Sequence, residues 1–266
     1  MLHVAVAGAS GRMGRLVIEQ IAAAHDVKLV GALEHAQSAE LGADAGGYAG
    51  HPCGVRVTQH VETAMDGADV IIDFSTGHAT AELVTAAARL GVACVIGTTS
   101  LDDDGVAALR AAEEKVPVLL AANMSLGVQV LAHALRETLR LVGDGWDVEI
   151  IETHHHAKKD APSGTALRLA NVVKQARDLD DDDLRHGRHG ALAQRVPGEV
   201  GIHAVRAGDV VGDHMVVLAG PGERIELTHR ASSRVVFAAG ALRAARWIKG
   251  RAPGRYSIGD VLGIAG

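Results

Sequence analysis

One loop of the sequence concentrates groups that can transfer protons and bind anions. Residues 154–156 are three consecutive histidines, and Lys158 and Lys159 follow directly after Ala157. Lysine is scarce here, with six in 266 residues, so a pair beside three imidazoles is not ordinary surface solvation. An imidazole near neutral pKa can hold and release a proton at working pH. The loop therefore predicts a general-acid site for an acidic substrate.

A helix start directly follows this loop. Ser163 can serve as the N-cap and Pro162 as the entry of a helix that begins at Gly164. The backbone N–H groups of Gly164 and Thr165 then point out of the helix end, where a carboxylate would bind. A solvated loop and a transition-metal site are the alternatives. The run lacks the spaced ligands and the carboxylate partner that would fix a metal geometry, so we predict no metal.

A glycine-rich segment near the N-terminus is typical of phosphate binding. Gly8, Gly11 and Gly14 are spaced three apart, between an apolar strand-like run at residues 2–7 and a helical pattern. The first permits a tight turn, the second lets backbone N–H groups approach a pyrophosphate, and the third allows close packing of helix on sheet. The helix N-terminus adds partial positive charge. We predict a dinucleotide-binding turn, with a plain strand-to-helix connection as the alternative.

Glu34 supports the dinucleotide interpretation. It lies at the end of the second predicted strand, 20 residues after Gly14, where an acidic side chain accepts hydrogen bonds from an adenosine ribose. Its charge favours NAD, because a carboxylate repels the 2′-phosphate of NADP. His35 and Arg12 soften that preference, so use of both cofactors stays open.

Two further loops follow predicted strands of the same sheet. Ligands of such sheets sit beyond the carboxyl ends of the strands, so we expect these loops to meet the nicotinamide half of the cofactor. Helix capping is the alternative role. Including these loops, the predicted cofactor-binding residues are Gly8, Ala9, Ser10, Gly11, Arg12, Met13, Glu34, Gly97, Thr98, Thr99, Ala121, Ala122, Asn123 and Met124.

The alternation of elements predicts an α/β fold in two domains. Strand-like runs and helical patterns alternate through the first half, which indicates a doubly wound, Rossmann-type parallel sheet with crossover helices. After about residue 125 the pattern favours an α+β domain with a mixed or antiparallel sheet. We predict a dinucleotide-binding domain at 1–125 plus 233–266, and a substrate-binding and oligomerisation domain at 126–232.

The expected elements follow from apolar periodicity. The predicted strands of the first domain are 2–7, 27–33, 70–74, 92–96 and 116–121, and its helices are 13–24, 80–90 and 105–115. The second domain is expected to contain helices 126–141 and 164–175, a strand 147–152, an exposed loop 178–189, and alternating strands over 201–211 and 214–230. A helix at 237–248 is expected to end the chain and to pack on the first domain.

Composition excludes several classes of partner. The formal charge of −6, from 32 acidic and 26 basic residues, offers no broad cationic surface for nucleic acid. The apolar runs are much shorter than the roughly 20 residues of a membrane span. The N-terminus has no secretory leader pattern, so a cytoplasmic location is expected. Two cysteines, Cys53 and Cys94, do not build a disulfide framework.

With both motifs in view, the chain resembles the dihydrodipicolinate reductase family, the 4-hydroxy-tetrahydrodipicolinate reductases of the diaminopimelate route to lysine. The resemblance runs nearly end to end. It rests above all on ETHHHAKKDAPSGTA at residues 152–166. Further support comes from residues 6–14, 97–99, 121–125, 206–209, 212–214 and 226–234.

The resemblance implies a mechanism and an assembly. It makes His154 the proton donor, Lys158 its catalytic partner that grips the substrate's charge, and His155 with the Gly164 and Thr165 amides the holders of a substrate carboxylate. Hydride passes from NADH or NADPH to an unsaturated cyclic imine dicarboxylate, and protonation of the neighbouring carbon follows. Family members close their two domains around the substrate and form homotetramers through sheets of the second domain.

Two rival functions remain. One is another nicotinamide oxidoreductase with a similar two-domain layout, such as an aspartate or semialdehyde dehydrogenase. A semialdehyde dehydrogenase of the acylating kind needs a nucleophilic cysteine after the Rossmann half, whereas Cys94 falls inside a predicted strand. A non-catalytic sensor would bind NADH without turnover and use the His/Lys loop for a protein partner or a metal.

Overall fold

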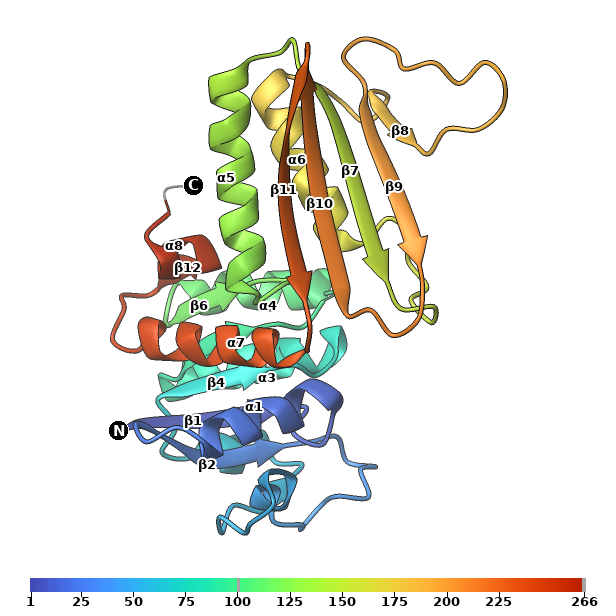
Figure 1. Ribbon diagram of the computed structural model, residues 1–266. Helices are drawn as coiled ribbons and strands as arrows, with labels where there is room; N and C mark the ends of the chain where they lie inside the picture. Colours follow the sequence, from blue (N-terminus) through green and yellow to red (C-terminus); the bar gives the residue numbers. More distant parts are fainter. Residues whose placement is uncertain (100, 265–266) are drawn as a thin grey trace. The chain divides into compact units, whose positions relative to one another are not determined.

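The chain forms two compact units. The computed structural model describes residues 1–99 and 101–264. The first unit comprises Met1–Leu126 together with Arg234–Gly266, and the second comprises Gly127–Ser233 (Figure 1).

The first unit contains a parallel sheet at whose switch point a ligand is expected to bind. Among the described residues its seven strands follow the order β12-β6-β5-β4-β1-β2-β3, and every neighbouring pair is parallel. Since the chain leaves β1 in one direction and reaches β4 in the other, a crevice forms at their carboxyl ends. The predicted Rossmann-type sheet is confirmed. The strands are β1 Leu2–Ala7, β2 Val27–Leu33, β3 Val57–Thr58, β4 Val70–Asp73, β5 Ala93–Ile96, β6 Pro117–Leu120 and β12 Gly254–Tyr256.

Helices cover both faces of this sheet because its strands are apolar on both sides. In β1, Val4 and Val6 face the core formed with α1 and α7, whereas Ala5 and Ala7 face α2, α3 and α4. All four side chains are fully buried. The helical elements are α1 Arg12–Ala22, the 3₁₀ turn η1 Ala45–Ala49, α2 Val61–Met65, α3 Gly77–Leu90, α4 Asp103–Glu113, α7 Val235–Ile248 and α8 Ile258–Leu262.

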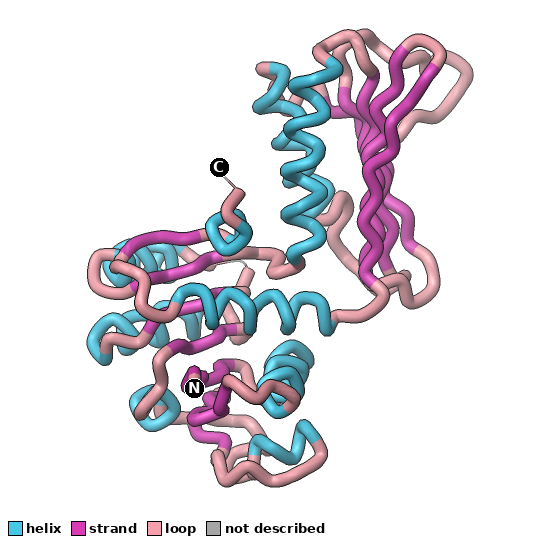
Figure 2. The backbone as a smooth tube through the Cα atoms, turned by 60° about the vertical axis from the view of Figure 1, so that its left-hand side comes forward, coloured by secondary structure: helices cyan, strands magenta, loops and turns pink. Residues whose placement is uncertain are grey.

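The second unit has a mixed sheet with helices on one face. Its described strands follow the order β11-β10-β7-β9-β8; β11, β10 and β7 pair antiparallel, and β9 and β8 continue in parallel. Helices α5 Leu126–Val142 and α6 Gly164–Arg177 both pack on the face that carries Val148 and Ile150 (Figure 2). The strands are β7 Asp147–His154, β8 Leu184–His186, β9 Val200–Arg206, β10 Gly212–Gly220 and β11 Glu223–Ala231.

Two expectations about element order are wrong. The helix at 237–248 does not end the chain, because β12 and α8 follow it and add an edge strand beside β6. The segment 178–189 is not wholly an exposed loop, since β8 pairs with β9 within it. Elements of three to five residues are too short to show a hydrophobic period, and pairing with distant segments stabilises them.

A buried carboxylate joins three segments at the end of β4. Asp73 is fully buried and accepts hydrogen bonds from the Thr80 hydroxyl at 2.7 Å and the Thr98 hydroxyl at 2.9 Å. It also accepts from the backbone N–H of Ser75 at 2.8 Å and from its hydroxyl at 2.5 Å. This carboxylate therefore fixes the loops after β4 and β5 against α3.

We predict that Asp73→Ala lowers the free energy of unfolding by about 2–4 kcal/mol, because it leaves buried donors without an acceptor. Urea unfolding followed by circular dichroism measures the change. Asp66→Ala is the matched control, since Asp66 is exposed in the same unit. Equal stability of the two variants would contradict the role assigned to Asp73.

Candidate active site

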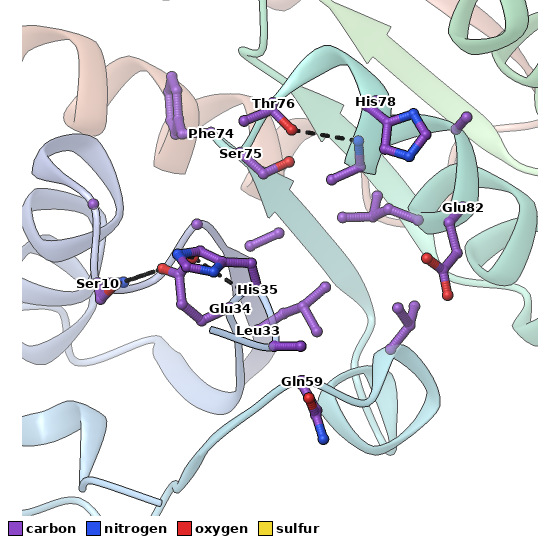
Figure 3. A pocket seen from close by; sticks show the side chains of 18 of the residues that line it. Ser10, Leu33, Glu34, His35, Gln59, Phe74, Ser75, Thr76, His78 and Glu82 are labelled. Carbon is purple, nitrogen blue, oxygen red and sulfur yellow. Dashed lines mark hydrogen bonds and ion pairs between the residues drawn. The ribbon is translucent and has the colours of Figure 1, made fainter. Parts of the chain in front are cut away.

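A cavity opens at the carboxyl ends of β1, β2 and β4, where the switch point lies. Its volume is about 860 Å³. The glycine-rich turn contributes Gly8, Ser10 and Gly11, and the end of β2 contributes Glu34. Figure 3 shows Ser10 and Glu34 joined on one side and Thr76, His78 and Glu82 on the other. The size and position suit the adenosine half of a dinucleotide.

The turn itself leaves no room for side chains. Gly8 has φ of +69°, and a Cβ there would lie 2.6 Å from the carbonyl oxygen of Phe74. A Cβ on Gly14 would lie 2.1 Å from the carbonyl oxygen of Gly8, so only glycine lets α1 start this close to the turn. Bare backbone at a helix N-terminus is the arrangement that binds a pyrophosphate. The residues present thus fit a dinucleotide.

Glu34 is held in place by the turn. Its Oε2 accepts hydrogen bonds from the backbone N–H of Ser10 at 2.9 Å and from the Ser10 hydroxyl at 2.6 Å. Burial raises the pKa of the Glu34 carboxyl, but the bonds from Ser10 and the His35 N–H outweigh it and hold the pKa below its usual value. A carboxylate is therefore available as an acceptor for ribose hydroxyls, and it also anchors the loop.

The remaining predicted cofactor residues lie outside this cavity. Ala9, Arg12 and Met13 do not line it: Ala9 is fully buried, Arg12 is exposed, and Met13 packs on the core. The loops after β5 and β6 also lie apart from it. In these loops the Thr98 hydroxyl donates a hydrogen bond to Asp73, and Met124 is buried. The other predicted cofactor-binding residues of these two loops are Gly97, Thr99, Ala121, Ala122 and Asn123. The two loops are neighbours because β5 and β6 are adjacent in the sheet.

In the second unit, the predicted proton donor is held by a buried carboxylate. The Nδ1 of His154 lies 2.5 Å from Oε2 of Glu152. Both residues are on β7, and a spacing of two places their side chains on the same face of the strand. Glu152 is fully buried and His154 is 8% exposed, so this pair is shielded from bulk water.

Arg206 pairs with Glu152 through both carboxylate oxygens. Its Nη1 and Nη2 atoms lie 2.9 Å from Oε2 and Oε1, and the backbone N–H of Ser163 donates to Oε1 at 3.1 Å. Burial raises the pKa of the Glu152 carboxyl, but the bonds from Arg206 and His154 prevail and lower it. Glu152 therefore stays a carboxylate.

The same arginine reaches the lysine loop. Nη2 of Arg206 donates to the carbonyl oxygen of Asp160 at 2.6 Å, and the Asp160 carboxylate pairs with Lys158 Nζ at 2.8 Å. The Lys158 side chain is 21% exposed, so its charge is accessible at the rim of the site. Lys158 and His154 are thus linked through Asp160, Arg206 and Glu152.

The other predicted substrate residues lie around this network. Ser163 caps α6 by accepting from the Ala166 N–H at 3.1 Å, which places Gly164 and Thr165 in the first helical turn. Gly164 is exposed, and His155 and Thr165 are half-buried. His156 instead donates from Nδ1 to the carbonyl oxygen of Gly208, 2.9 Å away, and so helps to hold the loop.

His214, which has no role predicted from the sequence, lies beside His154. The rings of His214 and His154 meet edge to face with centroids 5.2 Å apart, and Nε2 of His214 lies 3.1 Å from the Ser163 hydroxyl. Burial, and then the nearby charge of His154, lower the pKa of His214 to about 4. The only indication in the sequence that His214 could belong to the site is its place in residues 212–214, which support the family resemblance.

Two other classes of site find no support in the described parts of the chain. Across residues 1–99 and 101–264, no cluster of three histidine, cysteine, aspartate or glutamate side chains is arranged to hold a metal ion. Within the same ranges, no helix is long and apolar enough to cross a bilayer. Cys94 is fully buried in β5, and burial raises the pKa of its thiol, so it is no candidate for the nucleophile of an acylating dehydrogenase.

We predict that the second unit loses stability in acid through His214. The pKa of this imidazole is about 4 in the folded chain and about 6.5 when unfolded, so its contribution is complete above 6.5 and is lost as pH falls toward 4. The loss amounts to about 3 kcal/mol. His214→Gln is expected to remove this acid-induced loss of stability. Urea unfolding near pH 7 and pH 4.5 measures the free energy of unfolding of each variant at both pH values. His25→Gln, an exposed histidine, is the control; if it shows the same acid response as His214→Gln, the assignment fails.

Comparison with known proteins places both units in one family. The family model described as "Dihydrodipicolinate reductase, N-terminus" matches residues 2–124, and "Dihydrodipicolinate reductase, C-terminus" matches residues 127–262. The 4-hydroxy-tetrahydrodipicolinate reductase of Anaeromyxobacter dehalogenans (strain 2CP-C) is 47% identical over 100% of this chain and 99% of its own length. That of Thiobacillus denitrificans is 49% identical over 99% of each chain.

Solved structures share the fold. A dipicolinate-bound dihydrodipicolinate reductase from Paenisporosarcina sp. TG-14 has a TM-score of 0.76 at 23% identity and covers 97% of each chain. A DAP dehydrogenase from C. glutamicum has a TM-score of 0.55 at 14% identity, over 97% of this chain and 92% of that one. The predicted class, an NAD(P)H-dependent oxidoreductase, is confirmed by the family matches. Both halves of the sequence match the same reductase at full length, and the chain therefore belongs to the dihydrodipicolinate reductase family.

Proposed function

We propose that this chain reduces 4-hydroxy-tetrahydrodipicolinate, through the dihydrodipicolinate imine, to tetrahydrodipicolinate in the diaminopimelate route to lysine, with His154 as proton donor. The roles proposed for His154 and Lys158 rest on one observation. A histidine with one ring nitrogen held by a buried carboxylate lies in the same network as an accessible lysine. That combination can bind an anion and protonate a carbon next to it.

Each predicted site residue of the second unit then has a defined role in the reaction. The bound nicotinamide supplies the hydride. Lys158 attracts a substrate carboxylate, and the N-terminal turn of α6 at Gly164 and Thr165, with His155, holds a carboxylate by charge and backbone N–H groups. His154 gives its proton to the carbon next to the one reduced. The dipicolinate bound by the Paenisporosarcina reductase supports a small cyclic dicarboxylate as the substrate.

The cavity of the first unit favours NADH over NADPH. Four carboxylate residues are among the described residues that line it, with no lysine or arginine: Glu34, Glu82, Asp102 and Asp104. A 2′-phosphate placed there would meet negative charge without a cationic partner. The histidines on its rim, His35, His60 and His78, supply weaker partners, so NADPH remains a slower alternative.

Assembly and location stay predictions of the sequence. The face of the second sheet opposite α5 and α6 carries Ile151, Met215 and Val217, all half-buried, and Val205, which is 42% exposed. These apolar side chains lie on a sheet face that no helix covers and that also carries the ion pairs of Glu149. They support association with further copies of the chain, and the proposed form is a homotetramer. A cytoplasmic location fits the proposed role.

The function is tested by following NADH and NADPH absorbance with freshly made product of the preceding synthase. Rapid oxidation that depends on this product, faster with NADH, is the expected result. Cofactor binding without turnover would favour the sensor instead.

We predict that His154→Ala lowers kcat by about 10²–10⁴-fold with little change in NADH affinity, because it removes the proton donor alone. Lys158→Ala is expected to lower kcat and raise KM together, since its charge also binds the substrate. Steady-state kinetics and fluorescence titration of NADH separate the two effects. Wild-type turnover by His154→Ala would refute the proton-donor role.

We predict that Glu34→Gln shifts the ratio of NADH to NADPH affinity toward NADPH by about tenfold, because it removes the charge that repels a 2′-phosphate. Glu34→Ala is expected to weaken both cofactors, since it also releases Ser10 and the glycine-rich turn. Titration of each cofactor measures the change. An unchanged ratio in Glu34→Gln would show that Glu34 does not face the ribose.

A further inference from the structure

The environment of Glu152 defines the protonation state of its neighbour. Both carboxylate oxygens already accept hydrogen bonds, from the two terminal nitrogens of Arg206 and from the Ser163 N–H. An ionised carboxylate has no proton to donate. The short contact between Glu152 Oε2 and His154 Nδ1, at 2.5 Å, is then a hydrogen bond in which Nδ1–H is the donor. His154 consequently keeps a proton on Nδ1 whether its ring is neutral or charged.

The other ring nitrogen is left for chemistry. Among the residues that the structure describes, Nε2 of His154 has no hydrogen-bond partner. The backbone of Gly212 lies beside it, and a Cβ at that position would come within 3.0 Å of Nε2 and 3.4 Å of Cδ2. The φ angle of Gly212 is not in the left-handed region, so backbone conformation does not demand glycine there. Glycine at 212 therefore keeps the Nε2 edge of the ring open.

We propose that Glu152 is the positioning residue of the reduction: its buried carboxylate holds Nδ1–H of His154, so that Nε2 carries the proton delivered to the substrate. This inference rests on the proposed function. In the transfer, the Nε2–H bond breaks and a C–H bond forms at the carbon next to the one that received hydride. The imidazolium becomes a neutral ring still bonded to Glu152, and water returns a proton to Nε2.

Glu152 also links the proton donor to the substrate-binding charge. Arg206, which pairs with Glu152, holds the carbonyl of Asp160, whose carboxylate pairs with Lys158. The charged and titratable groups around the His154 ring are thus Glu152, Arg206, Lys158 and His214. Removing the Glu152 charge disfavours the imidazolium and frees the ring to rotate, and both effects reduce the fraction of enzyme with a proton on Nε2 aimed at substrate.

The test compares Glu152→Gln with wild-type enzyme over a range of pH. We expect kcat to fall by about 10- to 100-fold with KM changed less than about threefold, and NADH affinity to be unchanged. The alkaline limb of the pH–rate profile moves to lower pH, because the acid form of the site is less stable. In a His154→Ala background, the same substitution causes no further loss. A merely structural role would not produce these last two results.

Glu149→Gln is the matched control. Glu149 lies on the same strand and pairs with Arg188 at 2.8 Å and His203 at 2.6 Å, but its side chain points to the opposite face of the sheet. We expect it to keep the wild-type pH–rate profile. A wild-type profile in Glu152→Gln, or an equal loss with and without His154, would overturn the proposal. If His154→Ala itself retains full turnover, the proposed function fails first.

Gly212→Ala gives a second test that leaves the Glu152 network intact. The added methyl group presses on the Nε2 edge, so kcat is expected to fall at least about fivefold while NADH affinity and the melting temperature stay near wild type. Full activity in this variant would show that Nε2 is not the atom that delivers the proton, and would overturn the proposal even if Glu152→Gln fails to fold.

Discussion

The bidentate pair between Glu152 and Arg206 organises the buried polar network of the second unit. A buried charge is tolerated only when it is paired and hydrogen-bonded, and Glu152 meets both conditions through Arg206, Ser163 and His154. The register that places His154 of β7 opposite Arg206 of β9 brings the pair together. One ion pair thus holds His154, the cap of α6 and the lysine loop in a single arrangement.

The first unit depends on a different constraint, the close approach of backbone to backbone at the end of β1. Gly8 and Gly14 allow contacts that no side chain would permit, and Glu34 anchors Ser10 from the neighbouring strand. The Glu34 carboxylate, proposed to meet a ribose, therefore also shapes the glycine-rich turn. The proposed contact of Glu34 with the cofactor and its anchoring of the turn involve the same carboxylate, so charge and anchoring need separate substitutions.

The sequence predicted the elements with a strong local period and missed those that depend on distant pairing. Residues 27–33 were expected as a strand and form β2 with those bounds, whereas β12 exists because it pairs with β6, more than a hundred residues earlier. The residues of the candidate site divide in the same way, into local motifs and contacts between distant segments. The His/Lys loop and the glycine-rich turn are local motifs, but the link from Glu152 to Arg206 spans 54 residues and exists only once the sheet has formed.

Glu152 is proposed to fix the proton of His154 on Nδ1, and nitrogen-15 NMR detects the position of that proton. Two-bond ¹⁵N–¹H correlation spectra of the histidine-labelled enzyme, at a pH where the ring is neutral, distinguish the two tautomers. The chain has 15 histidines, so the His154 signal is assigned from its loss in a His154→Gln variant. We expect a protonated Nδ1 and a bare Nε2. A neutral ring with its proton on Nε2 would contradict the positioning role proposed for Glu152.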